Sequence, residues 1–294
     1  MTEITLLDGG LGQELVRRSG EPPTPLWATQ VMLDHPGMVQ AVHRDYFDAG
    51  ATVATTNTYA IHHDRFTGTP LEGRLEELIA LALSEAARAA ADREGVRIAG
   101  SIGPLVASYR PEIHPAHDAA VPLYAELARR LAPRADVILV ETIASVQHAV
   151  AALEGARSGG KPVWLAVTVD DEDGAILRSG EPLSELAALE PDAWLANCSA
   201  PEAMAAALDA LKAFGKPFGA YANGFTQITK EFLADKPTVD TLSARGDMTP
   251  ERYAGFAMDW VGQGATIVGG CCETGPDHIR AIAERLRAAG HAIV

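Results

Sequence analysis

The sequence predicts a (β/α)8 barrel, the TIM-barrel architecture of the α/β class, as a single domain over residues 1–294. Eight short apolar, β-branched segments recur along the chain with helical segments between them. Most of the eight are continuously apolar rather than alternating, as strands covered on both faces are. The length of 294 residues is close to the ~250 residues typical of this fold. An open doubly wound sheet is the second interpretation, and the count of eight makes it weaker.

The predicted strands are 4–10, 51–59, 96–104, 135–143, 161–169, 192–200, 216–224 and 265–272. Helix signals lie between them: Pro36 and Gly50 bracket the helix before the second strand, and apolar residues recur at helical spacing after Pro201 and Pro276. Two connections exceed the ~2–6 residues usual for such units, one at about 105–122 and one at about 225–249. Both follow the C-terminal ends of strands, the face on which barrel active sites are built.

Composition excludes several classes of function. The formal net charge of −15 argues against a nucleic-acid partner and against an anionic membrane surface, whereas a cationic small molecule is better tolerated. The N-terminus MTEITLL lacks a secretory pattern, and no apolar run approaches the ~20 residues of a membrane span. We therefore expect a cytoplasmic protein. Three cysteines form no disulfide framework in that compartment, so metal binding or thiol chemistry is expected.

Polar residues at the C-terminal ends of barrel strands are the active-site candidates. They are Asp8, Thr56, Asn57, Tyr59, Glu141, Asn197, Cys198, Asn223, Cys271 and Cys272. The lysines beside strands, Lys161 and Lys216, fall at the opposite end. This position argues against a Schiff-base aldolase, which needs its lysine inside the barrel or at its active face.

The cysteines predict a metal site. Strands six and eight are separated only by strand seven, at ~4.8 Å per strand, so Cys198 could converge with Cys271 and Cys272 on one zinc ion at ~2.3 Å. Neighbouring residues of a regular strand face opposite sides. We therefore expect Gly269 and Gly270 to supply the backbone freedom that turns both cysteines toward one ion. The alternative is that the cysteines are buried packing residues.

Three cysteine ligands leave one position of a tetrahedral zinc ion open, which is typical of a catalytic site. An all-thiolate shell is electron-rich and suits the binding of a substrate thiol as a thiolate that stays nucleophilic. The residues therefore predict alkylation of a zinc-bound thiol.

Motifs in the same order resemble the homocysteine S-methyltransferase family: LLDGGLGQEL, LWATQVMLDHPGMVQAVHRDYFDAG, TNTY, VETI, NCSAPEAM and IVGGCCETGPDHIRAI. That family includes betaine-dependent and S-methylmethionine-dependent enzymes and the homocysteine module of cobalamin-dependent methionine synthase. The resemblance covers nearly the whole chain. It implies a (β/α)8 barrel and a zinc-dependent transfer of a methyl group to the zinc-bound thiolate of homocysteine, which gives methionine.

The resemblance also implies roles for individual residues. The zinc ligands are Cys198, Cys271 and Cys272; the carboxylates that hold the homocysteine ammonium are Asp8 and Glu141; the groups that bind its carboxylate are the Gly9 backbone and the Thr56 hydroxyl. The alternatives are a turn cap for Asp8 and a buried ion pair with a loop arginine for Glu141.

The methyl donor is expected to be a cation, which aromatic faces attract. Candidates for the donor wall are Trp27, Tyr59, Tyr109 and Tyr221, with Asn223 in YANGF beside them. Betaine-using members typically carry a longer C-terminal extension, and this chain ends at Val294 without an added folate or cobalamin domain. These features favour S-methylmethionine or S-adenosylmethionine. Betaine, a methyl-folate and a methyl-corrinoid from a separate corrinoid protein are the alternatives.

Two other functions compete with methyl transfer. Glycine-rich turns after the last two strands often bind phosphate, which would make a phosphate-ligand barrel. A non-catalytic zinc-binding or redox-sensing barrel would use the vicinal cysteines differently. The loop histidines His62, His63, His114 and His117 offer a competing metal site, although such residues are usually solvated or capping. The oligomeric state is left open, because outer helix faces serve packing and association alike.

Overall fold

A computed structural model of the chain describes residues 2–22, 24, 26–226 and 243–294. The strands form one sheet in the order β2-β3-β4-β5-β6-β7-β8-β1-β9, and each pair of neighbouring strands in it is parallel. Their bounds are β1 (Glu3–Leu6), β2 (Val53–Thr55), β3 (Arg97–Ile102), β4 (Val137–Ile143), β5 (Val163–Val167), β6 (Ala193–Asn197), β7 (Phe218–Tyr221), β8 (Ile267–Val268) and β9 (Ala292–Ile293). Each predicted strand overlaps one of β1 to β8, and only the two-residue β9 was not expected.

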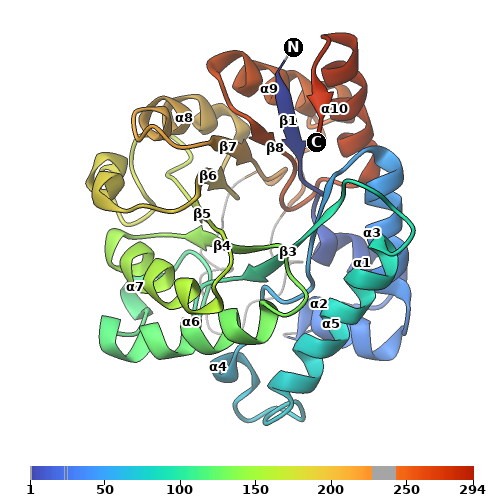
Figure 1. Ribbon diagram of the computed structural model, residues 1–294, viewed down its shortest axis with the longest axis vertical. Coiled ribbons are helices and arrows are strands. Elements are labelled where there is room, and N and C mark those ends of the chain that lie inside the picture. Colours follow the sequence, from blue (N-terminus) through green and yellow to red (C-terminus); the bar gives the residue numbers. More distant parts are fainter. Residues whose placement is uncertain (1, 23, 25, 227–242) are drawn as a thin grey trace.

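The two ends of the curled sheet meet. β1 pairs with β8 through Thr5 and Ile267, and a parallel bridge joins Leu7 to Val53 at the start of β2. The Thr52 amide also donates to the Leu6 carbonyl at 2.8 Å. Figure 1 shows the strands around a common centre with the helices outside them. The predicted TIM-barrel class is confirmed, and the open doubly wound sheet is not observed.

Helices follow the strands in the expected order, with one exception. The α-helices are α1 (Leu11–Ser19), α2 (Trp27–Asp34), α3 (Met38–Ala49), α4 (His63–Phe66), α5 (Leu75–Ala90), α6 (His117–Leu131), α7 (Val146–Ala156), α8 (Met204–Lys212), α9 (Pro250–Gln263) and α10 (Pro276–Ala288). The 3-10 helices are η1 (Pro111–Ile113), η2 (Arg157–Gly159), η3 (Leu183–Ala188) and η4 (Pro201–Ala203). The predicted stop at Gly50 is a left-handed cap with φ of 114°.

The exception is the connection between β5 and β6, in which η3 replaces the expected α-helix. The segment that precedes η3 folds back on itself through antiparallel bridges of Val169 with Leu177 and of Ile176 with Pro182. These bridges use backbone groups that a helix would need, and the Asp- and Gly-rich sequence DDEDG favours turns over helix. The strict alternation of strand and helix predicted for this unit was therefore wrong.

The two long connections also differ from expectation or fall partly outside the structure. The connection predicted at 105–122 ends at 116, because α6 begins at His117 and includes Pro122. Pro122 lies in the second turn of α6, where proline removes one intrahelical hydrogen bond. Of the connection predicted at 225–249, residues 227–242 lie outside the described residues, and Phe225 and Ala244 form a bridge beside them.

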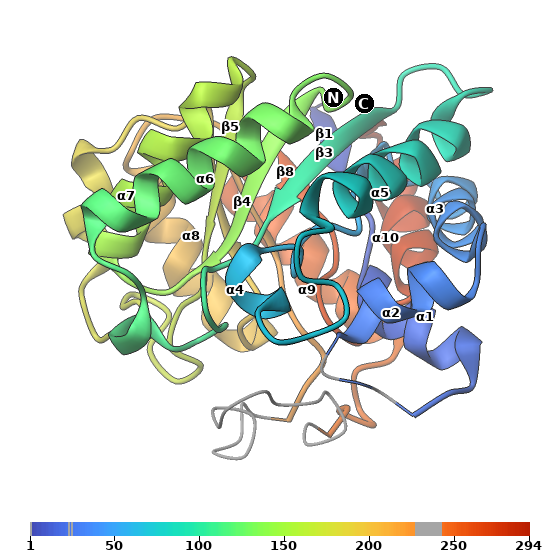
Figure 2. The same ribbon diagram turned by 90° about the horizontal axis from the view of Figure 1, so that it is seen from below.

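The sheet positions the polar residues at one end of the barrel. Because the strands are parallel, their C-terminal ends share one side, and the two chain termini lie together on the other (Figure 2). The barrel interior is filled by apolar side chains from its strands, and Cys271 packs against them. Within the described part of the chain, no helix combines the length and apolar character needed to cross a bilayer.

Candidate metal centre and active site

Three free thiols meet at the C-terminal end of the barrel. The Sγ atom of Cys198 lies 2.6 Å from that of Cys271 and 3.5 Å from that of Cys272. The Sγ atoms of Cys271 and Cys272 are 4.0 Å apart. Among the described residues this is the one group of three or more His, Cys, Asp or Glu side chains close enough together to hold a metal ion. The predicted convergence of the three cysteines is therefore present in the fold.

The ends of three neighbouring strands hold these thiols. Cys198 follows β6, has a left-handed φ of 52°, and donates its amide to the Tyr221 carbonyl at 3.1 Å. Cys271 donates its amide to the Ala222 carbonyl at 2.9 Å, and Cys272 accepts a hydrogen bond from the Gly224 amide at 2.9 Å. The chain just beyond β7 therefore pairs with both sides of the site and fixes the backbone of all three cysteines.

The glycine pair before the cysteines acts differently from the expectation. Neither Gly269 nor Gly270 has a left-handed φ. Instead, a Cβ atom at Gly269 would lie 2.5 Å from the Leu7 Cβ, and one at Gly270 would overlap the Thr274 Oγ1. Close packing against β1 and against the turn that follows therefore requires glycine at both positions, and the expected backbone freedom stays a prediction.

The residues fit a zinc ion. Two thiolates at ~2.3 Å from one tetrahedral ion lie about 3.8 Å apart, and the Cys272 distances of 3.5 Å and 4.0 Å bracket this value. The 2.6 Å between Cys198 and Cys271 must open by about 1 Å for the same geometry. Three soft thiols with no protein ligand in a fourth position among the described residues match a catalytic zinc shell.

Asp8 is buried in the short connection between β1 and α1. Its Oδ1 accepts a hydrogen bond from the Thr55 hydroxyl and its Oδ2 accepts one from the Thr55 amide, each at 2.7 Å. The His43 Nδ1 lies 3.9 Å from Oδ2. The side chain therefore reaches across to β2 instead of capping its own turn, so the turn-cap alternative is not observed.

Glu141 is buried near the end of β4. One carboxylate oxygen accepts a hydrogen bond from the Ser101 hydroxyl, and the other accepts one from the Tyr221 hydroxyl at 3.0 Å. No arginine pairs with Glu141 among the residues that the structure describes, so the ion-pair alternative is not observed either. Both carboxylates thus keep neutral hydrogen-bond donors as their partners.

Burial makes both acids weak. It raises the pKa of Asp8 from 3.8 to about 7; the hydrogen bonds from Thr55 lower that pKa, and the nearby charge of Glu141 raises it. Burial also raises the pKa of Glu141 from 4.5 to about 7, against the hydrogen bonds from Ser101 and Tyr221. A bound cation would restore both charges, because an ammonium group offsets the cost of burying a carboxylate.

The two groups predicted to bind a carboxylate differ in availability. The Gly9 amide makes no hydrogen bond within the described part of the chain. The Thr56 hydroxyl accepts from the Ser101 amide at 3.0 Å and lies 2.7 Å from the Thr58 hydroxyl, whose own proton goes to the Ser101 carbonyl. The Thr56 hydroxyl therefore donates its hydrogen bond to the Thr58 hydroxyl. It could donate to a ligand only if that hydrogen bond were broken.

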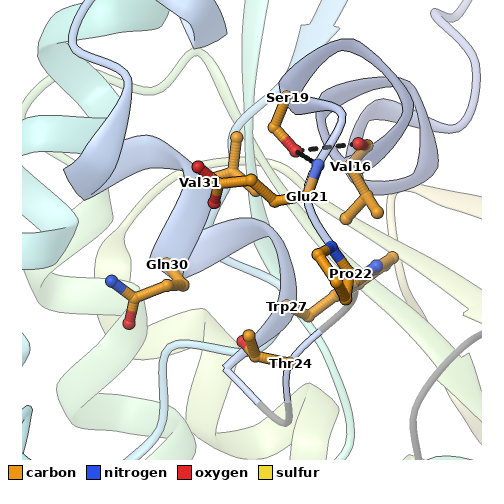
Figure 3. Close-up of a pocket in the computed structure, with 8 residues that line it drawn as sticks. All are labelled: Val16, Ser19, Glu21, Pro22, Thr24, Trp27, Gln30 and Val31. Carbon is orange, nitrogen blue, oxygen red and sulfur yellow. Dashed lines mark hydrogen bonds between the residues drawn. The ribbon is translucent and has the colours of Figure 1, made fainter.

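Two of the aromatic candidates are only half-buried and close together. The rings of Trp27 and Tyr59 meet edge to face with centroids 6.5 Å apart. The Tyr59 hydroxyl also pairs with the Ser108 hydroxyl at 2.7 Å. Trp27 further lines a small pocket between α1 and α2, with Val16, Gln30 and Val31 among its neighbours (Figure 3). That pocket includes no cysteine and neither buried acid, so it is separate from the thiol cluster.

The other donor-wall candidates are committed to protein contacts. Tyr221 donates to Glu141, and the Tyr109 hydroxyl lies 3.5 Å from the Cys198 carbonyl. The Arg178 guanidinium lies 5.1 Å from the centre of the Tyr109 ring. Asn223 accepts a hydrogen bond from the Phe225 amide at 3.1 Å and shapes the turn after β7. These residues support the site, and Trp27 and Tyr59 are the more accessible aromatic pair.

The predicted loop histidines form no metal site. His62 bonds to the Tyr59 carbonyl at 2.9 Å, and the His114 ring packs against the His148 ring with centroids 3.9 Å apart and a tilt of 35°. His63 and His117 pair with acidic side chains at the surface. The described histidines belong to no group that brings three ligand atoms together.

The sequence analysis missed the residues that form hydrogen bonds to the predicted acids and to the backbone beside the thiol cluster. They are Thr55 and Ser101, which bond to the two acids, and Tyr253 of α9, whose hydroxyl lies 3.0 Å from the Ala222 carbonyl and 2.9 Å from the Gly269 carbonyl. Ser101 is a polar residue inside an apolar strand, which is a usable signal. Thr55, the last residue of β2, bonds to Asp8, whereas its neighbour Thr56 accepts a hydrogen bond from the Ser101 amide of β3.

The comparison with known families decides the assignment. The model of the family described as homocysteine S-methyltransferase matches residues 5–286. The chain belongs to the homocysteine S-methyltransferase family. The predicted family and the predicted enzyme class, transfer of a methyl group to homocysteine, are thereby confirmed.

Relatives match over nearly their full lengths. Homocysteine S-methyltransferase YbgG of Bacillus subtilis (strain 168) is 28% identical over 95% of this chain and 93% of its own. Selenocysteine Se-methyltransferase of Brassica oleracea var. italica is 25% identical over 96% and 88%. The crystal structure of the metallated form of the homocysteine methyltransferase MmuM from Escherichia coli superposes with a TM-score of 0.79, at 25% identity and 96% coverage of both chains.

Proposed function

We propose that this enzyme binds zinc through Cys198, Cys271 and Cys272 and transfers a methyl group from a cationic sulfonium donor to homocysteine. The convergence of three thiols within 4.8 Å of one another, beside two buried acids, carries the proposal. The chain would act as one barrel domain in the cytoplasm on small-molecule substrates.

Asp8 and Glu141 would hold the substrate ammonium. Each carboxylate has an oxygen with remaining lone pairs, and each is buried, so an ammonium would make strong charge-assisted hydrogen bonds there. The free Gly9 amide would donate to the substrate carboxylate, and the Thr56 hydroxyl would join it after releasing Thr58. Together these groups would bind the ammonium and the carboxylate of an α-amino acid and orient its side chain toward the thiol cluster.

Zinc bound by the three cysteines would lower the pKa of the substrate thiol, so that the acceptor is a thiolate at neutral pH. The barrel interior supplies the dry surroundings, because Cys271 packs against the apolar residues that fill it. The donor S–CH3 bond breaks as the new bond to the homocysteine sulfur forms, and the donor leaves as a neutral thioether. Opposite charges disappear in this step, so exclusion of water favours it.

The donor site would lie at Trp27 and Tyr59. They are the accessible members of the aromatic set, and their faces attract a sulfonium without forming an ion pair. The protein's net charge of −15 also favours a cationic donor. S-methylmethionine and S-adenosylmethionine are the donors we favour; betaine and a methyl-corrinoid or methyl-folate are the alternatives.

A donor panel tests this proposal. The enzyme is incubated with homocysteine and, in turn, each of the named donors, and methionine is quantified. We expect methionine with a sulfonium donor and about one zinc per chain by elemental analysis. A second panel replaces homocysteine with cysteine or selenocysteine, because a relative carries the name selenocysteine Se-methyltransferase.

Cysteine variants supply the control. Cys271→Ala should lose zinc and turnover together, since one thiolate of three is removed. Full activity in the demetallated enzyme or in Cys271→Ala would contradict the zinc proposal. Zinc without methionine from any donor would favour the non-catalytic barrel, and absence of zinc would favour the phosphate-binding one.

A further inference from the structure

A bulge in β4 aims Glu141. β4 pairs with β5 through Val140 and Leu165 and then through Ile143 and Val167, so β4 has one more residue than its partner over this interval. The additional residue falls at Glu141 and Thr142, and Thr142 has a left-handed φ of 63°. Bulges re-aim a side chain and leave a backbone group of the ladder without its usual partner.

The side chain of Asn197 takes the place of that partner. Its Oδ1 accepts a hydrogen bond from the Thr142 amide at 2.9 Å, and its Nδ2 donates to the Thr142 hydroxyl at 3.0 Å. Both residues are fully buried. β5 lies between β4 and β6 in the sheet, so this two-bond contact spans the end of β5. A carboxamide is suited to it, because it offers one acceptor and one donor side by side.

The same residue borders the metal centre. Asn197 is the last residue of β6, its backbone is in register with Tyr221 of β7, and Cys198 follows it with a left-handed φ. A left-handed φ in a non-glycine residue is strained and persists only where the surroundings enforce it. Asn197 thus connects two residues with a left-handed φ. One is Thr142, which directly follows Glu141, and the other is Cys198.

We propose that Asn197 is a positioning residue that holds Glu141 and Cys198 at a fixed separation and thereby selects a thiol amino acid of the length of homocysteine. The inference rests on the proposed function, in which Glu141 holds the ammonium and Cys198 holds the metal that receives the thiol. The contact across β5 then fixes the distance between the group that binds the substrate ammonium and the group that binds its sulfur. Cysteine, shorter by one methylene, would fit this separation poorly.

Loosening the contact should weaken that selection. In Asn197→Ala and in Thr142→Val, the KM for homocysteine should rise about tenfold, and the ratio of kcat/KM for homocysteine over cysteine should fall about tenfold. Thr142→Ser keeps the hydroxyl and should retain the ratio. The affinity for Co²⁺, measured by competition with a chelator, should fall about tenfold in Asn197→Ala, and the thiolate-to-cobalt absorption should change.

Two further variants separate positioning from general stability. Thr52→Val removes a hydroxyl that bonds to the Leu6 and Val294 carbonyls at the opposite end of the barrel; it should lower the Tm without changing the ratio. The Thr142 hydroxyl also interacts with Tyr59. Tyr59→Phe removes this interaction but keeps the two bonds between Asn197 and Thr142, so the homocysteine-to-cysteine ratio should stay unaltered.

The outcomes are distinct. The proposal is overturned if Asn197→Ala and Thr142→Val lower the Tm as Thr52→Val does while KM, the ratio and Co²⁺ affinity stay within about twofold of the unaltered enzyme. If the unaltered enzyme forms no methionine, the proposed function fails. The Co²⁺ measurement then still decides whether Asn197 positions Cys198. If Asn197→Ala does not fold, Thr142→Val and Thr142→Ser carry the test.

Discussion

The Sγ atoms of Cys198 and Cys271 lie 2.6 Å apart, although β7 separates the strands that carry them. The corresponding distances to Cys272 are 3.5 Å and 4.0 Å. The first pair is closer than the about 3.8 Å between two thiolate ligands of a tetrahedral zinc ion. An ion bound between them would therefore hold apart two thiols that otherwise approach each other.

This geometry predicts a specific oxidation product. Treatment of the demetallated enzyme with diamide should give a disulfide between Cys198 and Cys271 in preference to either pairing with Cys272, because their sulfurs are closest. Peptide mapping by mass spectrometry identifies the linked peptides. The zinc-loaded enzyme should resist the same treatment, because the thiolates are occupied. A majority of Cys198–Cys272 linkage would contradict the geometric argument.

Substrate affinity should depend on pH through the two buried acids. The pKa values of Asp8 and Glu141 are both raised to about 7, and only the ionised forms attract an ammonium. The kcat/KM for homocysteine should therefore rise as the pH increases from 6 to 8. In Asp8→Asn and in Glu141→Gln the activity should fall, and the dependence of kcat/KM on pH should reflect the ionisation of one carboxyl group instead of two. A profile in Glu141→Gln identical in shape to that of the unaltered enzyme would remove Glu141 from this role.

The same acids should cost stability above neutral pH. A carboxyl whose folded-state pKa is raised stabilises the fold below its unfolded pKa of 4.5, and this contribution is lost as the pH rises through about 7. Above pH 7 the folded protein carries the buried charge of Glu141. Glu141→Gln should therefore stabilise the reduced, metal-free protein by roughly 3 kcal/mol at pH 8.

Thermal unfolding at two pH values checks this. The gain from Glu141→Gln should be present at pH 8 and nearly absent at pH 4, where the unaltered carboxyl is already protonated. Glu76→Gln on the exposed face of α5 is the matched control, since it removes a carboxylate whose side chain is 84% exposed and pairs with Arg130 at the surface. A gain of equal size at both pH values would indicate a packing effect.

The sequence predicted the barrel and the thiol cluster because both depend on position along strands. Apolar runs of the right length define strands, and residues at their C-terminal ends converge in any parallel barrel. The contacts of Asp8 with Thr55 and of Glu141 with Ser101 could not be foreseen, since they depend on which way each side chain faces and on the register between neighbours. The bulge at Thr142 shifts that register by one residue, which no local pattern in VILVETI reveals.

The reason for the glycines escaped prediction for a similar cause. Conformational freedom is a local property that a sequence suggests, whereas the space beside Gly270 depends on Thr274, placed there by the following turn. The helix missing after β5 is another case, because tertiary bridges between Val169 and Leu177 replaced a local preference.

Gly270→Ala tests the packing explanation. A methyl group there would overlap the Thr274 Oγ1, which donates to the Cys271 carbonyl at 2.6 Å. We expect the turn to shift and the affinity for zinc to fall at least tenfold, since ligand geometry depends on such supporting contacts. The double variant Gly270→Ala with Thr274→Gly should recover part of the affinity by removing the overlapping atoms. Failure of the second change to recover any affinity would favour the backbone-freedom explanation.

The donor wall can be separated from the acceptor site by paired variants. Trp27→Leu should raise the KM for the sulfonium donor about tenfold, because a desolvated cation–aromatic contact contributes up to about 2 kcal/mol, and should leave the KM for homocysteine unchanged. Tyr109→Leu is the comparison: its ring already faces the Arg178 guanidinium, and its hydroxyl approaches the Cys198 carbonyl. A second cation beside Arg178 would be repelled, so Tyr109→Leu should alter zinc affinity and kcat more than the donor KM. Initial-rate kinetics with each substrate varied in turn distinguishes the two patterns, and a rise of the donor KM in Tyr109→Leu but not in Trp27→Leu would place the donor against Tyr109 instead.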